Sequence, residues 1–320
     1  MPSLAVDDWY ALLARARAER VAPLLAGAPG PPPAVGATLE RDRRATLGRA
    51  LLRGRAVAET VAALAAAGVE PVLLKGHALA ETVYGDPGRR PMDDVDLLVP
   101  RESLSQVIVA LAPLGYAVTP QYAADVRRRA ATLLVPSPRG SRPALDVHWD
   151  LVDARCGPAA ARWSRGALAR AERAPSTPGA RVLEPADAVI HACVHLTVHH
   201  GLAGLRWYCD LAMMARAWRG RFEWDAVAAR SLDAGLGGIV WAPLAVAEIA
   251  LGPVAPSAAL ARLAPRGARA RAFARWLLPR IARLERVPRQ DRVVPLLLLE
   301  RGRDVARLVT GRLARRAAAQ

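Results

Sequence analysis

The sequence predicts an α+β fold, in which a small mixed β-sheet domain is followed by an all-α helical domain. Strand-like apolar runs bounded by turn residues occur before residue 151, whereas only helical periodicity follows residue 158. The apolar residues are mostly Ala, Leu and Val and only 5% of residues are aromatic, which favours helix. With 320 residues, 52% of them hydrophobic, the chain can form two cores.

The first half alternates helices with short strands. We expect helices over 5–25, 38–67, 77–84, 103–114 and 122–130, and strands over 71–75, 94–99, 115–119, 131–135 and 144–151. The long helix ends at Gly68, a residue that readily takes positive φ. Its apolar stripe is expected to comprise Leu47, Leu51, Val57, Val61 and Leu64. The last two strands are expected to form a hairpin.

The second half is predicted to be a bundle of short helices separated by Gly and Pro. These helices cover 184–200, 204–219, 223–234, 238–251, 257–278 and 296–316. The predicted domain organisation is an N-terminal helix with a Pro-rich linker at 1–37, a catalytic domain at 38–155 and an α-helical accessory domain at 156–320.

The charge is strongly basic and unevenly distributed. The net charge is +16, and residues 260–320 hold sixteen arginines and four acidic residues, a balance of +12. Such a tail can meet nucleic acid or another anionic partner, or form solvated arginine faces of helices. The acidic N-terminus lacks a signal-peptide pattern, no apolar run approaches the roughly 20 residues that span a bilayer, and the three cysteines have no metal-like spacing. We therefore expect a soluble, cytoplasmic protein with reduced thiols.

Carboxylates at alternating strand positions are the first candidate site. Asp94 and Asp96 are two residues apart on the predicted strand 94–99 and should share a face. Asp146 and His148 share a face of the strand 144–151 in the same way. If the two strands are neighbours, Asp146 completes a cluster of three carboxylates, a set that suits hard divalent cations.

A Lys-Gly turn between a strand and a helix is the second candidate. Gly76 would let a phosphate approach the backbone at the start of the helix. Lys75 is the single lysine among 45 basic residues, which suggests a role that arginine cannot fill. The turn is neither a P-loop nor a Rossmann glycine motif.

Together, the segments LLKGHALAETVYGDPGRRPMDDVDLLV and LDVHWDL resemble a bacterial nucleotidyltransferase-like family, related to the minimal nucleotidyltransferases and the palm of DNA polymerase beta. The resemblance extends over residues 45–215. In that superfamily a glycine turn opens a helix, Asp-x-Asp follows on a strand, and a third carboxylate lies on a later strand. Gly76, Asp94, Asp96 and Asp146 match those positions. His77 departs from the usual Ser or Gly after the turn glycine.

The resemblance implies transfer of a nucleoside monophosphate from an NTP to an acceptor hydroxyl, with release of pyrophosphate. Asp94, Asp96 and Asp146 would be the catalytic carboxylates that hold two Mg²⁺ or Mn²⁺ ions. The nucleotide phosphates would lie against the backbone of Gly76 and His77, with Lys75 and one of the two arginines Arg89 and Arg90 offsetting their charge.

Histidines repeat along one face of the predicted helix 184–200. His191, His195 and His199 are four residues apart, and Arg206 and Asp210 follow one turn apart on the next helix. This set can line a substrate cleft, together with His148, or bind Zn²⁺, or serve only the packing of the helix.

The acceptor remains open at this stage among a small molecule, a peptide or protein, and an RNA end. Two alternatives to the enzyme remain open as well. One is a protein that binds nucleotide or nucleic acid on the same fold without turnover. The other is a toxin-like transferase that modifies RNA or protein.

Overall fold

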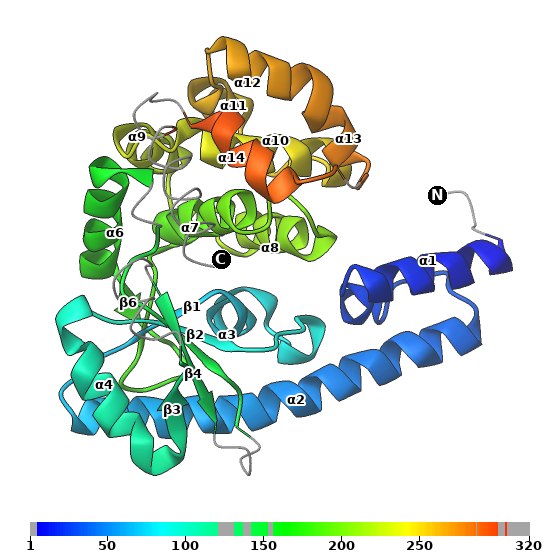
Figure 1. The fold of residues 1–320 in the computed structure, drawn as a ribbon. Coiled ribbons are helices and arrows are strands. Elements are labelled where there is room, and N and C mark those ends of the chain that lie inside the picture. The colour runs from blue at the N-terminus through cyan, green and yellow to red at the C-terminus, as the bar shows by residue number, and fades with distance from the viewer. Residues whose placement is uncertain are drawn as a thin grey trace. The chain divides into compact units, whose positions relative to one another are not determined.

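The computed structural model describes residues 5–120, 131–136, 142–152, 156–285, 287–299 and 305. These residues fall into two compact units. The sheet unit comprises the described residues of 1–123, 131–148 and 173–182, and the helical unit comprises those of 124–130, 149–172 and 183–320. The predicted α+β class is confirmed (Figure 1).

The sheet unit is built on a mixed seven-stranded sheet, counted over the described residues, with strand order β3-β4-β5-β2-β1-β7-β6. The strands are β1 Val72–Leu74, β2 Val95–Leu98, β3 Tyr116–Val118, β4 Ala131–Pro136, β5 Leu145–His148, β6 Glu172–Arg173 and β7 Arg181–Val182. Strand β2 pairs antiparallel with β1 and parallel with β5. The predicted hairpin is confirmed by the antiparallel pairing of β4 with β5.

The sheet's register follows from its apolar positions. Val95 and Leu97 are fully buried, as alternation along β2 predicted. Val95 lies opposite Leu145, and this alignment places Asp96 opposite Asp146 on the parallel neighbour. Burial alternates along β5, so a shift of that strand by one residue would bury Asp146 and His148 in place of Leu145 and Val147.

Helices α1 Val6–Ala18, α2 Pro33–Ala66, α3 Lys75–Leu79 and α4 Leu104–Leu111 complete the sheet unit. Figure 1 shows α2 as one continuous helix, which begins five residues before its predicted start. Pro33 at its first position explains this, because proline is well suited to the first turn of a helix. Gly68 follows with φ of +73°, in agreement with the predicted helix end.

The predicted apolar stripe of α2 was wrong at Leu51, which is 64% exposed. Val57, Val61 and Leu64 are buried as expected, together with Ala50. Six residues, or about 1.7 helical turns, separate Leu51 from Val57, so the two side chains point to different sides.

The expectation that no strand follows residue 158 was also wrong. Strand β7 pairs in parallel with β1, with Val72 opposite Arg181 and Leu73 opposite Val182. A two-residue strand is too short to show an alternating pattern in the sequence, and its extended form depends on pairing with the edge of β1.

The helical unit contains α6 Pro158–Arg170, α7 Pro185–Val198, α8 Leu205–Ala217, α9 Trp224–Asp233, α10 Gly237–Leu251, α11 Ser257–Leu263, α12 Ala268–Ala272, α13 Leu278–Ala282 and α14 Gln290–Leu298. The predicted helix 257–278 is interrupted between α11 and α12, where Pro265 and Gly267 lie. The predicted helix 296–316 was wrong at Leu299, which is extended, because α14 runs from Gln290 to Leu298 and ends there. The rest of that prediction, apart from residue 305, lies outside the described residues, as does the predicted helix 122–130.

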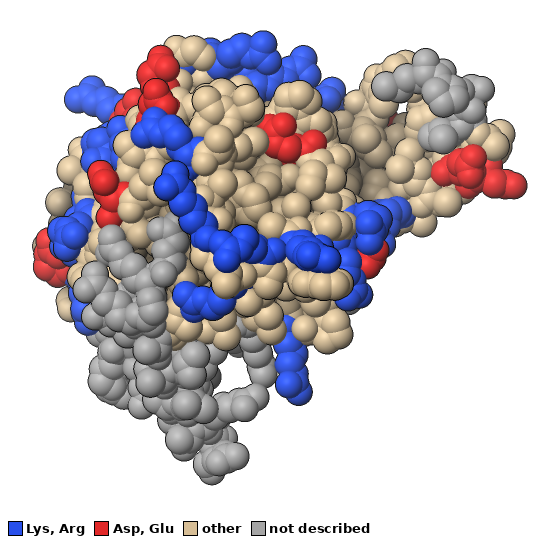
Figure 2. All heavy atoms as spheres, turned by 90° about the horizontal axis from the view of Figure 1, so that it is seen from above, with Lys and Arg blue, Asp and Glu red and all other residues tan. Residues whose placement is uncertain are grey.

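Basic side chains are spread over the face drawn in Figure 2, with acidic side chains between and beside them. Within the helical unit, Arg280 and Arg283 both pair with Glu285. Residues 300–304 and 306–320, which carry much of the predicted basic tail, lie outside the described residues. None of the described helices is both long enough and apolar enough to cross a membrane.

A buried carboxylate organises the start of α7. Asp187 is fully buried and accepts hydrogen bonds from the Trp163 indole (2.9 Å) and the Arg170 guanidinium (2.8 Å). Arg230 lies 3.2 Å from Asp187 and also contacts Glu184, whose side chain accepts from the Asp187 amide. Asp187 thus joins α6, α7 and α9.

We expect Asp187→Asn to lower the free energy of unfolding by about 2–3 kcal/mol, because the two partly exposed arginines lose a buried anionic partner. Denaturation in urea measures this change. Asp225→Asn is the matched control: it also removes a carboxylate that pairs with arginine, but its side chain is 81% exposed. Equal stability of the two variants would contradict the role assigned to Asp187.

Candidate metal centre

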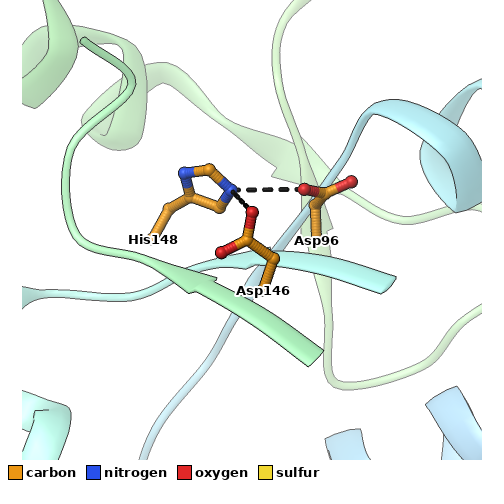
Figure 3. Close-up of side chains that lie close together, drawn as sticks. All are labelled: Asp96, Asp146 and His148. Carbon is orange, nitrogen blue, oxygen red and sulfur yellow. Dashed lines mark hydrogen bonds and ion pairs between the residues drawn. The ribbon is translucent and has the colours of Figure 1, made fainter. Parts of the chain in front are cut away.

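Three side chains meet where β2 and β5 run side by side. Asp96 comes from β2, and Asp146 and His148 come from β5 (Figure 3). The His148 Nε2 atom lies 3.1 Å from the Asp146 Oδ2 atom and 3.2 Å from the Asp96 Oδ1 atom. One ligand atom from each residue lies within 4.8 Å of the other two. We call these three residues the Asp-Asp-His cluster.

The Asp-Asp-His cluster is open on one side. The side chains of Asp96 and His148 are 6% and 12% exposed, whereas that of Asp146 is 29% exposed. A small ion or a phosphate oxygen can therefore approach from the Asp146 side, while Asp96 forms the buried end.

Lys75 supplies a cation at that buried end. The antiparallel register places Leu74 opposite Asp96, so the next residue lies beside the carboxylate. The Lys75 Nζ atom is 2.5 Å from Asp96 Oδ1, and its side chain is 10% exposed. Lys75 has a φ of +44°, a left-handed conformation that costs a non-glycine residue about 1–2 kcal/mol. The ion pair offsets this cost.

The charges of the cluster are strongly coupled. Burial alone would raise the pKa of Asp96, but the Lys75 charge and the His148 hydrogen bond outweigh it and hold that pKa well below its usual value. Burial likewise opposes ionisation of Asp146, and the charge and hydrogen bond of His148 nevertheless lower its pKa. Both carboxyl groups are thus ionised at neutral pH.

His148 shows the reverse shift. Burial disfavours its charged form and so does the Lys75 charge, but the neighbouring charge of Asp146 and hydrogen bonds to Asp146 and Asp96 raise its pKa overall. The imidazole therefore binds a proton more readily than in water. It must give up that proton before it can act as a metal ligand.

Asp94, predicted to face the site with Asp96, precedes β2 and is exposed. Among the described residues, the group of three close ligand atoms contains His148 in place of Asp94. Partial burial of the Asp94 carboxyl group raises its pKa, and the negative charge of Asp96 raises it further. Asp94 thus lies within electrostatic range of the cluster, at its solvent side.

Gly76 lies in a tightly packed turn. A Cβ atom at this position would come within 3.1 Å of both the Arg90 guanidinium and the Met92 side chain. Arg90 is only 2% exposed, and its Nη1 atom is 3.4 Å from the Pro91 carbonyl oxygen. The structure therefore explains the glycine by close packing of the turn against residues 90–92.

The remaining residues predicted to bind nucleotide lie around the same turn. His77 is half-buried, and burial lowers its pKa although the Glu81 charge opposes the shift. The His77 ring lies close to α2, since a Cβ atom built on Gly54 of that helix would be 3.9 Å from the His77 Cε1 atom. Arg89 is half-exposed and its Nε atom is 3.7 Å from the Asp86 carboxylate.

Three arginines that the sequence analysis did not select gather near Asp93 and Asp94. Arg20 forms a two-pronged ion pair with Asp93. Arg53, on α2, lies within electrostatic range of Asp93 and Asp94 and of the neighbouring Arg49. No sequence signal distinguishes these three, because pairs of arginines at helical spacing are common in this chain.

The histidines of α7 form a separate cluster within the helical unit. The Nε2 atoms of His195 and His200 are 3.0 Å apart, and the His195 and His199 rings are stacked at 5.3 Å. Trp207 stacks on His200 at 4.7 Å, and the Arg206 guanidinium lies 4.2 Å from the Trp207 ring centre. His191 and Asp210 are buried, so the predicted histidine face continues into the interior of this unit.

The donor atoms of the Asp-Asp-His cluster fit a divalent cation. Carboxylate oxygens suit Mg²⁺ and Mn²⁺, and an imidazole nitrogen adds affinity for Mn²⁺ and other transition metals. The negative charge of the two carboxylates is offset by Lys75, and His148 lies within hydrogen-bond distance of both. A metal ion held by Asp96, Asp146 and His148 would supply positive charge directly.

Comparison with known proteins agrees with this geometry. The family model described as "Uncharacterised nucleotidyltransferase" matches residues 6–252, which include the whole Asp-Asp-His cluster and the turn at Gly76. No protein of curated function matches the sequence. Because the family model covers more than three quarters of the 320 residues, the chain belongs to the uncharacterised nucleotidyltransferase family.

Proposed function

We propose that the protein is a metal-dependent nucleotidyltransferase, which transfers a nucleoside monophosphate from an NTP to an acceptor hydroxyl. The acceptor oxygen forms a bond to the α-phosphorus, the bond from that phosphorus to the bridging oxygen breaks, and pyrophosphate leaves. The observation that supports this proposal best is the Asp-Asp-His cluster on the paired strands β2 and β5 of a chain from this family.

Asp96, Asp146 and His148 would hold the divalent cation. When bound, Mg²⁺ or Mn²⁺ would neutralise the carboxylates, orient the phosphate oxygens and lower the pKa of the acceptor hydroxyl. Whether a second ion binds depends on Asp94, which is exposed beside the cluster. Asp94 and Asp146 are the carboxylates that reach solvent, so either can take the proton of the acceptor hydroxyl.

The turn after β1 would serve the phosphates. Lys75 carries a compact charge that can move from Asp96 to a phosphate oxygen once a metal neutralises that carboxylate. The backbone at Gly76 and His77 begins α3, where amide groups lack helical partners. Arg90, buried against Gly76, would position this turn, and Arg89 would contribute from its exposed side.

A second candidate is a nucleotide-binding protein without turnover. The Lys75 ammonium group, 2.5 Å from Asp96 Oδ1, neutralises that carboxylate without a metal ion. A site in which the lysine permanently replaces the cation would bind phosphates and leave the hydroxyl inactive. Metal binding separates the two candidates.

We expect MnCl₂ to raise the melting temperature of the wild-type protein, because a ligand that binds only the folded state stabilises it. Asp96→Asn should remove most of this increase. Calorimetry with EDTA-treated protein provides the measurement. A wild-type melting temperature that does not respond to Mn²⁺ or Mg²⁺ would favour the protein without turnover.

For the reaction itself, we expect Asp96→Asn and Asp146→Asn each to reduce pyrophosphate release by about a hundredfold or more, since each removes a metal ligand. The assay supplies each of the four NTPs with Mg²⁺ or Mn²⁺ and follows pyrophosphate and the mass of the protein. Asp42→Asn, which breaks only the surface pair with Arg17, is the control. Full release by the Asp96 variant would refute the proposal.

The raised pKa of His148 predicts a pH-dependent stability of the metal-free protein. Protonated His148 stabilises the fold fully below its ordinary pKa of about 6.5, and this contribution is lost as the pH rises through the raised pKa. The stability advantage of the wild type over His148→Asn in EDTA should therefore shrink as the pH rises above about 6.5. Urea denaturation across this range measures it, and a constant difference would contradict the assignment.

A further inference from the structure

Three arginines of the sheet unit converge on the residues just before β2. Arg20 follows α1, and Arg49 and Arg53 lie on α2. We call Arg20, Arg49 and Arg53 the arginine cluster. Arg20 pairs with Asp93, and Arg53 lies within electrostatic range of Asp93, Asp94, Arg20 and Arg49; the two aspartates precede the strand carrying Asp96.

Packing of α2 fixes the position of the cluster. Arg49 and Arg53 are four residues apart and therefore lie on one face of the helix. Ala50, between them, packs with Ala80 and Met92 in a small buried group. This turn of α2 is thus pressed against the segment that leads directly into Asp93 and Asp94.

Arg20 and Arg49 are only lightly engaged. Arg20 donates to both Asp93 oxygens, but the two side chains are 39% and 65% exposed, so the pair is readily exchanged for a stronger one. Arg49 is exposed, and its guanidinium donates to the Thr46 hydroxyl at 3.1 Å. Both guanidinium groups retain further donors for an incoming anion.

Arg53 differs from both because its guanidinium has no hydrogen-bond partner at Nε among the described residues, although this atom is shielded from solvent. Burial lowers the pKa of Arg53, the charge of Asp93 opposes the shift, and the charge of Arg49 adds to it. The side chain as a whole is only half-buried. A rotation of the Arg53 side chain would present its N–H groups to an anion that approaches Asp93 and Asp94 from solvent.

The local charge balance favours such an anion. The cluster sets three arginines against the two carboxylates Asp93 and Asp94, and the charge of Asp96 also acts on Asp94. The planar fork of arginine matches phosphate oxygens in a two-pronged contact. By contrast, Arg90, which the sequence suggested for this task, is buried against the turn at Gly76.

We propose that the arginine cluster is a phosphate-binding subsite of the transferase site, with Arg53 as its central residue. The role of this subsite in the reaction rests on the proposed function, whereas the binding of phosphate by the arginine cluster does not. The phosphate belongs to the triphosphate tail of the NTP or to a phosphorylated acceptor, and the two sources can be separated by binding measurements.

The test measures binding of inorganic tripolyphosphate by calorimetry at constant ionic strength, with wild type, Arg53→Gln and Arg49→Gln. Arg53→Gln should weaken binding about tenfold or more, because charged two-pronged contacts are lost. Arg55→Gln is the matched control: it lies on the same helix, is 83% exposed and pairs with Glu59 away from the cluster. Its affinity should equal that of the wild type.

Two further ligands identify the source of the phosphate. If a non-hydrolysable α,β-methylene NTP is also bound more weakly by Arg53→Gln, the subsite takes the triphosphate tail. If only inorganic phosphate is bound more weakly and the NTP analogue is unaffected, the subsite takes a phosphate of the acceptor. Unchanged affinity for all three ligands in both cluster variants would overturn the subsite.

The melting temperature of each variant checks its folding. If Arg53→Gln unfolds, Arg49→Gln still tests the subsite, because Arg49 is exposed.

Failure of the subsite and failure of the transferase proposal give different results. Transfer that is lost in Asp96→Asn, with unchanged phosphate binding in the cluster variants, overturns the subsite alone. Phosphate binding that depends on Arg53 in a protein without metal-dependent transfer overturns the transferase and leaves a phosphate-binding site.

Discussion

The parallel pairing of β2 with β5 places two carboxylates side by side, and the rest of the sheet unit must compensate for their repulsion. Asp96 and Asp146 are opposite one another in the register, and Asp96 is almost completely buried. A buried and a half-buried anion at this spacing need positive charge or hydrogen-bond donors beside them if both are to stay ionised. The protein supplies these from both sides, by Lys75 after β1 and by His148 two residues beyond Asp146. The antiparallel strand β1 is therefore as necessary to the cluster as the two strands that carry the carboxylates.

The same requirement explains the turn that follows β1. Lys75 adopts a positive φ to direct its side chain to Asp96, and the chain then enters α3 at Gly76. A side chain at Gly76 would be crowded, because its Cβ atom would lie 3.1 Å from both the Arg90 guanidinium and the Met92 side chain. Met92 in turn packs in a buried group with Ala50 of α2. The conformation of one lysine is thus supported by packing that reaches from the loop before β2 to the longest helix of the unit.

The sequence was sufficient for β1 to β5 and for most helix positions, and the alternation of polar and apolar residues along 94–99 and 144–151 led to the meeting of Asp96 with Asp146. It was insufficient where the determining interaction is non-local. Strand β7 exists because it pairs with β1, and nothing within its two residues signals that partner. The sequence placed His148 on the same face as Asp146, but it could not show that His148, and not Asp94, is the third member of the cluster. That choice depends on where β2 begins. Arg53 carries no signal in the sequence, because what distinguishes it is a shielded Nε atom without a hydrogen-bond partner among the described residues, and this depends on packing.

The identity of the cation beside Asp96 is the point on which the chemistry depends. An ammonium group is small enough to approach the Asp96 Oδ1 atom at 2.5 Å while His148 Nε2 lies near the same oxygen. A planar guanidinium is larger, and its two-pronged contact would need the second carboxylate oxygen of Asp96 as well. This explains a lone lysine in a chain whose other basic residues are all arginine. In the proposed reaction, a lysine that neutralises the site before metal arrives would keep the two carboxylates ionised, and an incoming divalent ion would require that Lys75 move aside and that His148 give up its proton. The ammonium group of Lys75 would then remain beside the turn at Gly76, where it would offset the charge of a phosphate. One residue would thus stabilise the metal-free protein and also serve the proposed reaction.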